Sequence, residues 1–161
     1  MKIIFRILIL NIPIFLSNIL SAQSIGISEI NYHSEPSITS GNWIELYNYG
    51  ASTVDITGWK INKPSAITPF IFPTGTSLNA GEYLVVVNNP AAFILIYPSV
   101  SNYIGTLPFG AGNGGDTILL LDASNVLIES VMYSDSAPWP FGADGGGNTL
   151  ERITMGSGCC E

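Results

Sequence analysis

Tyr83-Leu-Val-Val-Val87, preceded by the turn Asn79-Ala-Gly81, carries the strongest buried-strand pattern of the chain and decides the fold class. A short run of β-branched and aromatic residues bounded by turn residues is typical of a buried strand. The next segment is the one plausible helix, because Asn89 can cap it, Pro90 suits its first position and Pro98 stops it. We therefore predict a strand over 83–87 and a helix of roughly two turns over Pro90–Tyr97.

Outward from this stretch, short apolar runs are broken about every eight to twelve residues by Gly, Pro or Asn, the spacing typical of a sandwich or barrel. Helical periodicity is nearly absent elsewhere. The pattern predicts an all-β fold of about seven to nine strands with one short helix. The other predicted strands are residues 25–32, 42–49, 54–56, 59–62, 70–72, 116–122, 126–133 and 149–153.

The N-terminus resembles a secretory signal peptide. Lys2 and Arg6 flank the start of an apolar run that continues to Leu20 and ends in small and polar residues suited to cleavage after Ala22. A membrane anchor needs roughly 20 predominantly apolar residues, and this shorter run contains Pro13. We therefore expect residues 1–22 to be a Sec signal peptide, and the protein to be secreted or held at the cell surface without a membrane span after cleavage.

The charge balance excludes several partners. Removing Lys2 and Arg6 leaves three of the five basic residues against all twelve acidic ones, a formal charge of −9. Nucleic acid binding depends on Lys and Arg that neutralise phosphates, so we expect no nucleic acid partner. An anionic membrane surface is disfavoured for the same reason. The 139 residues left of 161 fit one domain.

The two cysteines are adjacent and almost terminal. A bond between Cys159 and Cys160 would be strained, because their Cα atoms lie about 3.8 Å apart and unstrained disulfides need more. The core is therefore not stapled, and we interpret the pair as part of an incidental tail, with metal binding or pairing between chains as the alternatives.

Several segments together resemble the lamin tail domain of bacterial secreted proteins, in order and spacing. They are Ile27-Ser-Glu-Ile-Asn-Tyr32, Trp43-Ile-Glu-Leu-Tyr-Asn48, Asp55-Ile-Thr-Gly-Trp59, Phe72-Pro-Thr-Gly75, Gly81-Glu-Tyr-Leu-Val85, Gly115-Asp-Thr-Ile-Leu-Leu-Leu-Asp122 and Asp144-Gly-Gly-Gly-Asn-Thr-Leu-Glu-Arg152. The resemblance implies an immunoglobulin-like β-sandwich over residues 23–154, used as a non-catalytic module. Bacterial relatives usually continue past the Leu-Glu-Arg segment. The resemblance therefore leaves open that this chain is a truncated piece of a longer protein, with residues 155–161 as a short tail.

Catalytic motifs are sparse. His33 is the single histidine and no Gly-x-Ser-x-Gly elbow occurs, so a nucleophilic triad is not indicated. His33 is either a loop residue or, with Glu35, a metal ligand. The glycine-rich segment 110–115 lacks the Lys and the helix of a phosphate loop. Glu29 and Glu45 can face each other across adjacent strands, which suggests either a paired-carboxylate hydrolase or carboxylates that bind backbone and amide groups.

Calcium is the better chemical option, because it takes oxygen ligands from irregular loops. The segment 135–148 offers Asp135, Asp144 and Asn148, although aspartates that cap glycine-rich turns explain the same residues. We therefore expect no cofactor and keep calcium as the alternative. Trp139, between two prolines, is the candidate for an exposed ring that stacks on a sugar; packing onto the sandwich is the other reading.

Three functions follow from these observations. The leading one is a non-catalytic module for binding, adhesion or attachment, with an extracellular protein or glycan of unknown identity as its partner. The second is a calcium-dependent carbohydrate-binding module. The third is a hydrolase that uses Glu29 and Glu45.

Overall fold

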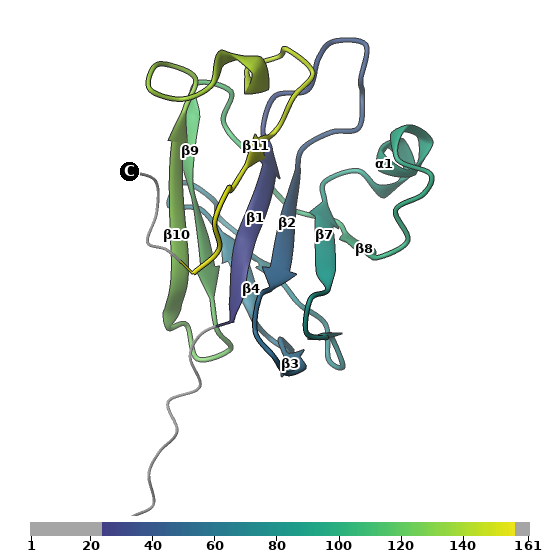
Figure 1. The fold of residues 1–161 in the computed structure, drawn as a ribbon, viewed down its shortest axis with the longest axis vertical. Coiled ribbons are helices and arrows are strands. Elements are labelled where there is room, and N and C mark those ends of the chain that lie inside the picture. Colours follow the sequence, from purple (N-terminus) through teal and green to yellow (C-terminus); the bar gives the residue numbers. More distant parts are fainter. Residues whose placement is uncertain (1–23, 157–161) are drawn as a thin grey trace, which may run out of the picture.

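The computed structural model describes residues 24–156. The expected signal peptide over residues 1–22 and the cysteine pair Cys159 and Cys160 lie outside the described residues. In the described part, strands dominate and one short α-helix lies beside them (Figure 1). No helix of this part is long and apolar enough to cross a membrane.

The larger sheet has five strands in the order β11-β1-β2-β7-β8. Its strands are β11 (Leu150–Glu151), β1 (Ile25–Asn31), β2 (Trp43–Asn48), β7 (Tyr83–Val87) and β8 (Tyr103–Gly105). The neighbouring pairs are antiparallel, except that β7 and β8 run parallel. Helix α1 (Pro90–Ile96) lies in the connection between β7 and β8, which is how this parallel pair is joined.

The second sheet has four strands in the order β10-β9-β4-β5 and packs behind the first (Figure 1). Its strands are β10 (Leu127–Ser134), β9 (Gly115–Leu121), β4 (Lys60–Asn62) and β5 (Phe70–Ile71). A two-stranded sheet of β3 (Val54–Asp55) and β6 (Ser77–Leu78) and a short 3₁₀ helix η1 (Phe141–Ala143) complete the fold.

The sequence predictions of an all-β sandwich and of one short helix are confirmed, and Asn89 caps the helix as expected. The described residues form eleven strands rather than seven to nine. The strands without a sequence prediction are β6 and β8, because two or three residues are too few to show an alternating pattern.

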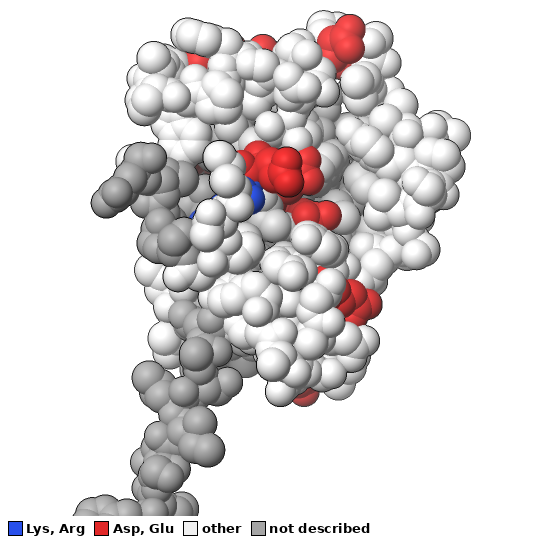
Figure 2. Space-filling view, viewed as in Figure 1, with Lys and Arg blue, Asp and Glu red and all other residues white. Residues whose placement is uncertain are grey.

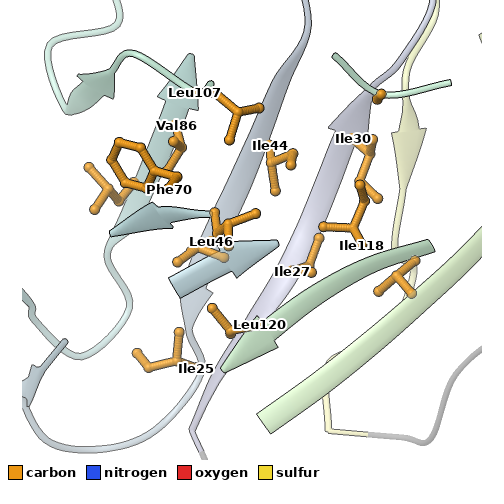
Figure 3. Packing of buried hydrophobic residues seen from close by; sticks show 14 of the residues in the cluster. Ile25, Ile27, Ile30, Ile44, Leu46, Phe70, Val86, Leu107, Ile118 and Leu120 are labelled. Atoms are coloured by element: carbon orange, nitrogen blue, oxygen red, sulfur yellow. The ribbon is translucent and has the colours of Figure 1, made fainter. Parts of the chain in front are cut away.

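The core lies between the two sheets. Alternate residues of each strand point inward, so Ile27, Ile44 and Leu46 from the larger sheet meet Ile118 and Leu120 of β9 (Figure 3). These side chains are at most 2% exposed. Trp59, the residue just before β4, also packs against this core.

A β-bulge in β1 changes which face its residues occupy. The register with β2 shifts between Ile27 and Glu29, so Ile27 and Ile30 both point into the core while Glu29 points outward. The freed backbone N–H of Ile27 donates to the Glu129 carboxylate of β10 at 2.7 Å, and Arg152 donates to the same carboxylate. The bulge therefore also links the two sheets at their open edge.

Helix α1 covers part of the outer face of the larger sheet. Its one buried residue, Phe93, packs with the outward residues Trp43 of β2 and Val85 and Val87 of β7 in a second, smaller cluster. Tyr97, just after the helix, packs against the same cluster. The outer face of the sheet is therefore apolar on the helix side and open on the side of β1 and β11.

Candidate functional site

Three glutamates lie in a row across the open part of the outer face. Glu45 of β2 pairs directly with Glu29 of β1, and Glu29 pairs with Glu151 of β11 on its other side. Directly opposed residues of an antiparallel pair have Cβ atoms about 4.5–5.5 Å apart, so the three side chains are close neighbours. The sequence prediction that Glu29 and Glu45 face each other is confirmed.

The row forms the floor of a depression of about 550 Å³, which we call the acidic hollow. It is lined by the three glutamates, by Trp43, Phe93 and Tyr97 on the helix side, and by the segment 147–149. Figure 2 shows acidic side chains gathered in the middle of this face, over β1, β2 and β11, with the surface hollowed beside them.

The aromatic side of the acidic hollow is a packed wall. The rings of Phe93 and Tyr97 both meet Trp43 edge-on, with ring centroids 6.2 Å and 6.0 Å from that of Trp43. Farther along β2, Tyr47 stacks on Tyr83 of β7 at 4.3 Å between centroids. The outward residues of β2 thus alternate as aromatic, carboxylate, aromatic: Trp43, Glu45 and Tyr47.

Hydroxyl groups hold two of the carboxylates. The buried Ser28 donates to Glu45 at 2.7 Å, and Thr149, just before β11, donates to Glu29. Both carboxylates are thus oriented by single neutral donors. The nearby guanidinium of Arg152 instead pairs with Glu129 of β10.

The electrostatics of the row favour the protonated forms of Glu29 and Glu45. Burial raises the pKa of Glu29, the hydrogen bond from Thr149 opposes this, and the charge of Glu151 adds to the rise. Burial likewise raises the pKa of Glu45 against the hydrogen bond from Ser28, and Glu29 and Glu151 raise it further. Negative charge is therefore costly in the acidic hollow at neutral pH.

Trp43, in the wall of the acidic hollow, has a hydrogen-bond donor without a partner. The residue is 6% exposed, and its indole N–H is buried without a hydrogen-bond partner. Buried polar groups are usually paired, so an unpaired one in the wall of a depression needs an explanation.

The predicted calcium ligands of the segment 135–148 occupy different surroundings. Asp144 lies 2.6 Å from the Nδ1 of His33, across a backbone bridge between these two residues. Asn148 lines the acidic hollow, and Asp135 accepts from Ser134 at 3.4 Å. Among residues 24–156, no group of three or more His, Cys, Asp or Glu side chains could hold a metal ion. Calcium binding in this segment stays a prediction.

The remaining candidates have structural surroundings. Trp139 is half-buried and packs against the main core. In the glycine-rich segment, Asp116 accepts from the backbone N–H of Gly112 at 3.1 Å and from Lys63 at 2.7 Å, which closes the loop. Stacking of a sugar on Trp139 stays a prediction.

Three parts of the site were not predicted from the sequence: Glu151, Thr149 and the helix-side wall. Alternation in 42–49 could have indicated the outward set Trp43, Glu45 and Tyr47. The pairing of β11 with β1 has no local signal, since its two strand residues, Leu150 and Glu151, set no register of their own.

Comparison with known proteins identifies the family. A family model described as Lamin Tail Domain matches residues 20–135, and a search among curated proteins found no significant match. The matched segment includes Glu29, Glu45 and the helix-side wall but ends before Glu151. The lamin tail domain is an immunoglobulin-like module and is generally non-catalytic. The chain, most of whose length is covered by this match, belongs to the lamin tail domain family.

Proposed function

We propose that the chain is a secreted or cell-surface module without catalytic activity, and that the acidic hollow binds its ligand. The observation that carries this proposal is the acidic row beside an aromatic wall in a depression of about 550 Å³. Binding sites are concave, largely apolar and equipped with a few placed polar groups, and the acidic hollow fits this description.

Secretion is supported by the sequence of residues 1–22, which resembles a signal peptide. A module of this kind would act outside the cell, on an extracellular protein or glycan. The calcium-dependent carbohydrate-binding alternative has one feature in its favour, since the stacked rings of Tyr47 and Tyr83 border the acidic row.

The hydrolase alternative has a specific observation in its favour, because Glu29 and Glu45 are directly opposed and line a depression. A carboxylate pair that catalyses hydrolysis needs environments that push the two pKa values apart, so that one group is an acid and the other a base or nucleophile. Here the pKa values of both carboxylates are raised, mainly by burial. The pair therefore fits a binding surface better than an acid and base.

The test compares wild type with Glu45→Gln, which keeps the acceptor for Ser28 and removes the charge. Both proteins are applied to glycan and peptide arrays, with and without calcium, and to a panel of glycoside and phosphoester substrates. We expect a ligand that binds wild type and is lost in the variant, without turnover. Turnover that Glu45→Gln abolishes would instead establish a hydrolase, and no bound ligand on any array would contradict a binding role for the acidic hollow.

A further inference from the structure

The tip of the glycine-rich segment before β9 carries the chain's single Asn–Gly pair, Asn113-Gly114. The backbone N–H of Gly115 donates to the carbonyl of Gly112 at 3.2 Å, which makes Asn113 and Gly114 the two central residues of a β-turn. Both central residues are exposed. The pair therefore lies in a solvent-accessible turn at one end of the sandwich.

The residues on either side of the pair are held in place. Gly112 donates its backbone N–H to the Asp116 carboxylate at 3.1 Å and accepts from the Tyr133 hydroxyl at 3.0 Å. Gly115 pairs with Ser134 of β10 as the first residue of its strand. The turn thus has two fixed ends.

The two groups of the pair that can react with each other are not engaged. In the part of the chain that the structure describes, neither the side-chain amide of Asn113 nor the backbone N–H of Gly114 has a hydrogen-bond partner. A Cβ placed on Gly114 would have the Asp135 carboxylate, at 3.9 Å, as its nearest non-adjacent neighbour. Glycine also lacks the side chain that would hinder the approach of its nitrogen to another group. The Gly114 nitrogen is therefore accessible to the side-chain carbonyl carbon of Asn113.

The chain's single Asp–Gly pair, Asp144-Gly145, can undergo the same kind of ring closure but has the opposite surroundings. Gly145 donates its backbone N–H to the carbonyl of His33 at 3.1 Å, and the Asp144 carboxylate lies 2.6 Å from Nδ1 of the same histidine. Both groups that would have to meet are thus held by other partners. The structure distinguishes a free pair at 113–114 from a held pair at 144–145.

We propose that Asn113 is a site of spontaneous deamidation, with the backbone nitrogen of Gly114 as the nucleophile. This nitrogen attacks Cγ of Asn113 and closes a succinimide ring. The bond from Cγ to the side-chain nitrogen breaks, and that nitrogen leaves as ammonia together with the proton lost from the Gly114 amide. A water molecule then opens the ring at either carbonyl, which leaves an aspartyl or an isoaspartyl residue at position 113.

Either product changes the turn. It adds a negative charge close to Asp135 and Asp116 in a chain whose formal charge is already −7. The isoaspartyl form also adds a CH₂ group to the backbone between the fixed residues Gly112 and Gly115. We therefore expect the modified protein to melt at a lower temperature and to open first at the start of β9.

The experiment incubates the purified chain in warm buffer at neutral pH. Intact mass follows the replacement of –NH₂ by –OH, and peptide mapping separates aspartyl from isoaspartyl forms. We expect product at position 113, no isoaspartyl form at position 144, and a melting temperature that falls as product accumulates. A parallel sample unfolded in urea should form isoaspartate at both positions, because it lacks the contacts of His33 that hold the second pair.

Three variants make the result specific. Gly114→Ala should slow the reaction about tenfold or more, because its methyl group raises the barrier to attack. The fold should accept this change, since Gly114 has space for a Cβ and no positive φ. Asn113→Asp imitates the aspartyl product and should melt at a lower temperature than Asn113→Ser, the matched control that removes the amide without adding a charge.

The other outcomes overturn the inference. Product at position 113 in urea but not in the folded chain would show that the turn protects Asn113, and no product in either sample would reject the site altogether. Equal rates for Gly114→Ala and wild type would reject the backbone nitrogen as the nucleophile. Equal rates at other asparagines of the folded chain would show that this turn has no special reactivity, and equal melting of Asn113→Asp and Asn113→Ser would reject the effect of the added charge.

Discussion

Glu45 is a carboxylate at a position where a neutral side chain would favour the stability of the fold. It stands on a central strand between Glu29 and Val85, where a neutral or apolar side chain would suit the packing. The protein keeps a carboxylate there, oriented by Ser28 at 2.7 Å. A group that costs stability and faces a depression is better explained by ligand contact than by folding.

We predict that Glu45→Gln stabilises the protein at neutral pH by roughly 0.2–1 kcal/mol, the range for like charges that oppose each other across strands. The pKa of Glu45 is raised in the folded state above its ordinary value of 4.5. Between these two values the folded state binds more protons than the unfolded state, so wild type loses stability as pH rises through this window. The gain from the variant should therefore vanish below the window and be complete above it.

Urea unfolding of both proteins across this pH range measures the gain. Glu35→Gln is the control, because Glu35 is exposed and lies outside the acidic hollow, and it should change the stability at neutral pH by less than Glu45→Gln. A variant Glu45→Gln that is less stable than wild type at neutral pH would show that the carboxylate stabilises the fold.

At the scale of elements, the aromatic wall depends on a helix of only seven residues. Isolated helices of this length are unstable, so α1 needs its cap and its packing. Asn89 accepts from the backbone N–H of Ala92 at 3.1 Å, and Phe93 anchors the helix against Trp43. A mutation that removes the cap should therefore also perturb the aromatic wall of the acidic hollow.

We predict that Asn89→Ala destabilises the protein by about 1 kcal/mol, the usual cost of a lost cap. Hydrogen exchange at residues 93–97 should accelerate more than exchange in β1 or β9, because the cap loss acts on the helix first. Asn89→Asp keeps the acceptor and should stay near wild type. Uniform acceleration over all strands would argue against a local role for the cap.

The edge between β1 and β10 depends on one carboxylate. Glu129 accepts from the backbone N–H of Ile27 and from Arg152, and the side chains of Glu129 and Arg152 are 16% and 14% exposed. We predict that Glu129→Ala costs about 3 kcal/mol, since it removes the acceptor of the buried Ile27 N–H and one partner of the Arg152 guanidinium. Glu129→Gln, which still accepts, should cost less in the same urea titration. Similar losses in both variants would mean that the charge alone matters.

Most strands could be predicted from the sequence, but how the strands pair could not. A continuous apolar run such as 83–87 is the pattern expected of a strand that is buried on both faces. Strands of this kind could therefore be predicted. The bulge between Ile27 and Glu29 and the pairing of Leu150 with Ile30 depend on contacts distant in the chain. For that reason Glu29 and Glu45 could be predicted as a pair, while Glu151 and the aromatic wall could not.

At the scale of the whole molecule, the two faces of the larger sheet carry different residues. The inner faces supply the core, and the outer face of the larger sheet carries helix α1 and the acidic row (Figures 1 and 2). The chain bears a formal charge of −7 with its N-terminal segment included. Such an excess keeps a protein soluble but opposes its compact state through repulsion.

This repulsion gives the last prediction, which compares two salts at equal ionic strength. Sodium chloride should raise the melting temperature modestly, because it screens the repulsion between exposed charges. Calcium chloride should give the same rise and EDTA should not change it, because screening depends on the ionic strength, which is the same in both salts.

A specific calcium site would look different, because a ligand that binds only the folded state adds about 2.7 kcal/mol at a hundredfold excess over its Kd. If calcium stabilises beyond the sodium control, Asp144→Asn and Glu29→Gln locate the ion. Loss of the extra stability in Asp144→Asn alone would place calcium in the segment 135–148 and favour the carbohydrate-binding alternative. Loss in Glu29→Gln alone would place it in the acidic hollow, where Glu45 and Glu151 flank Glu29.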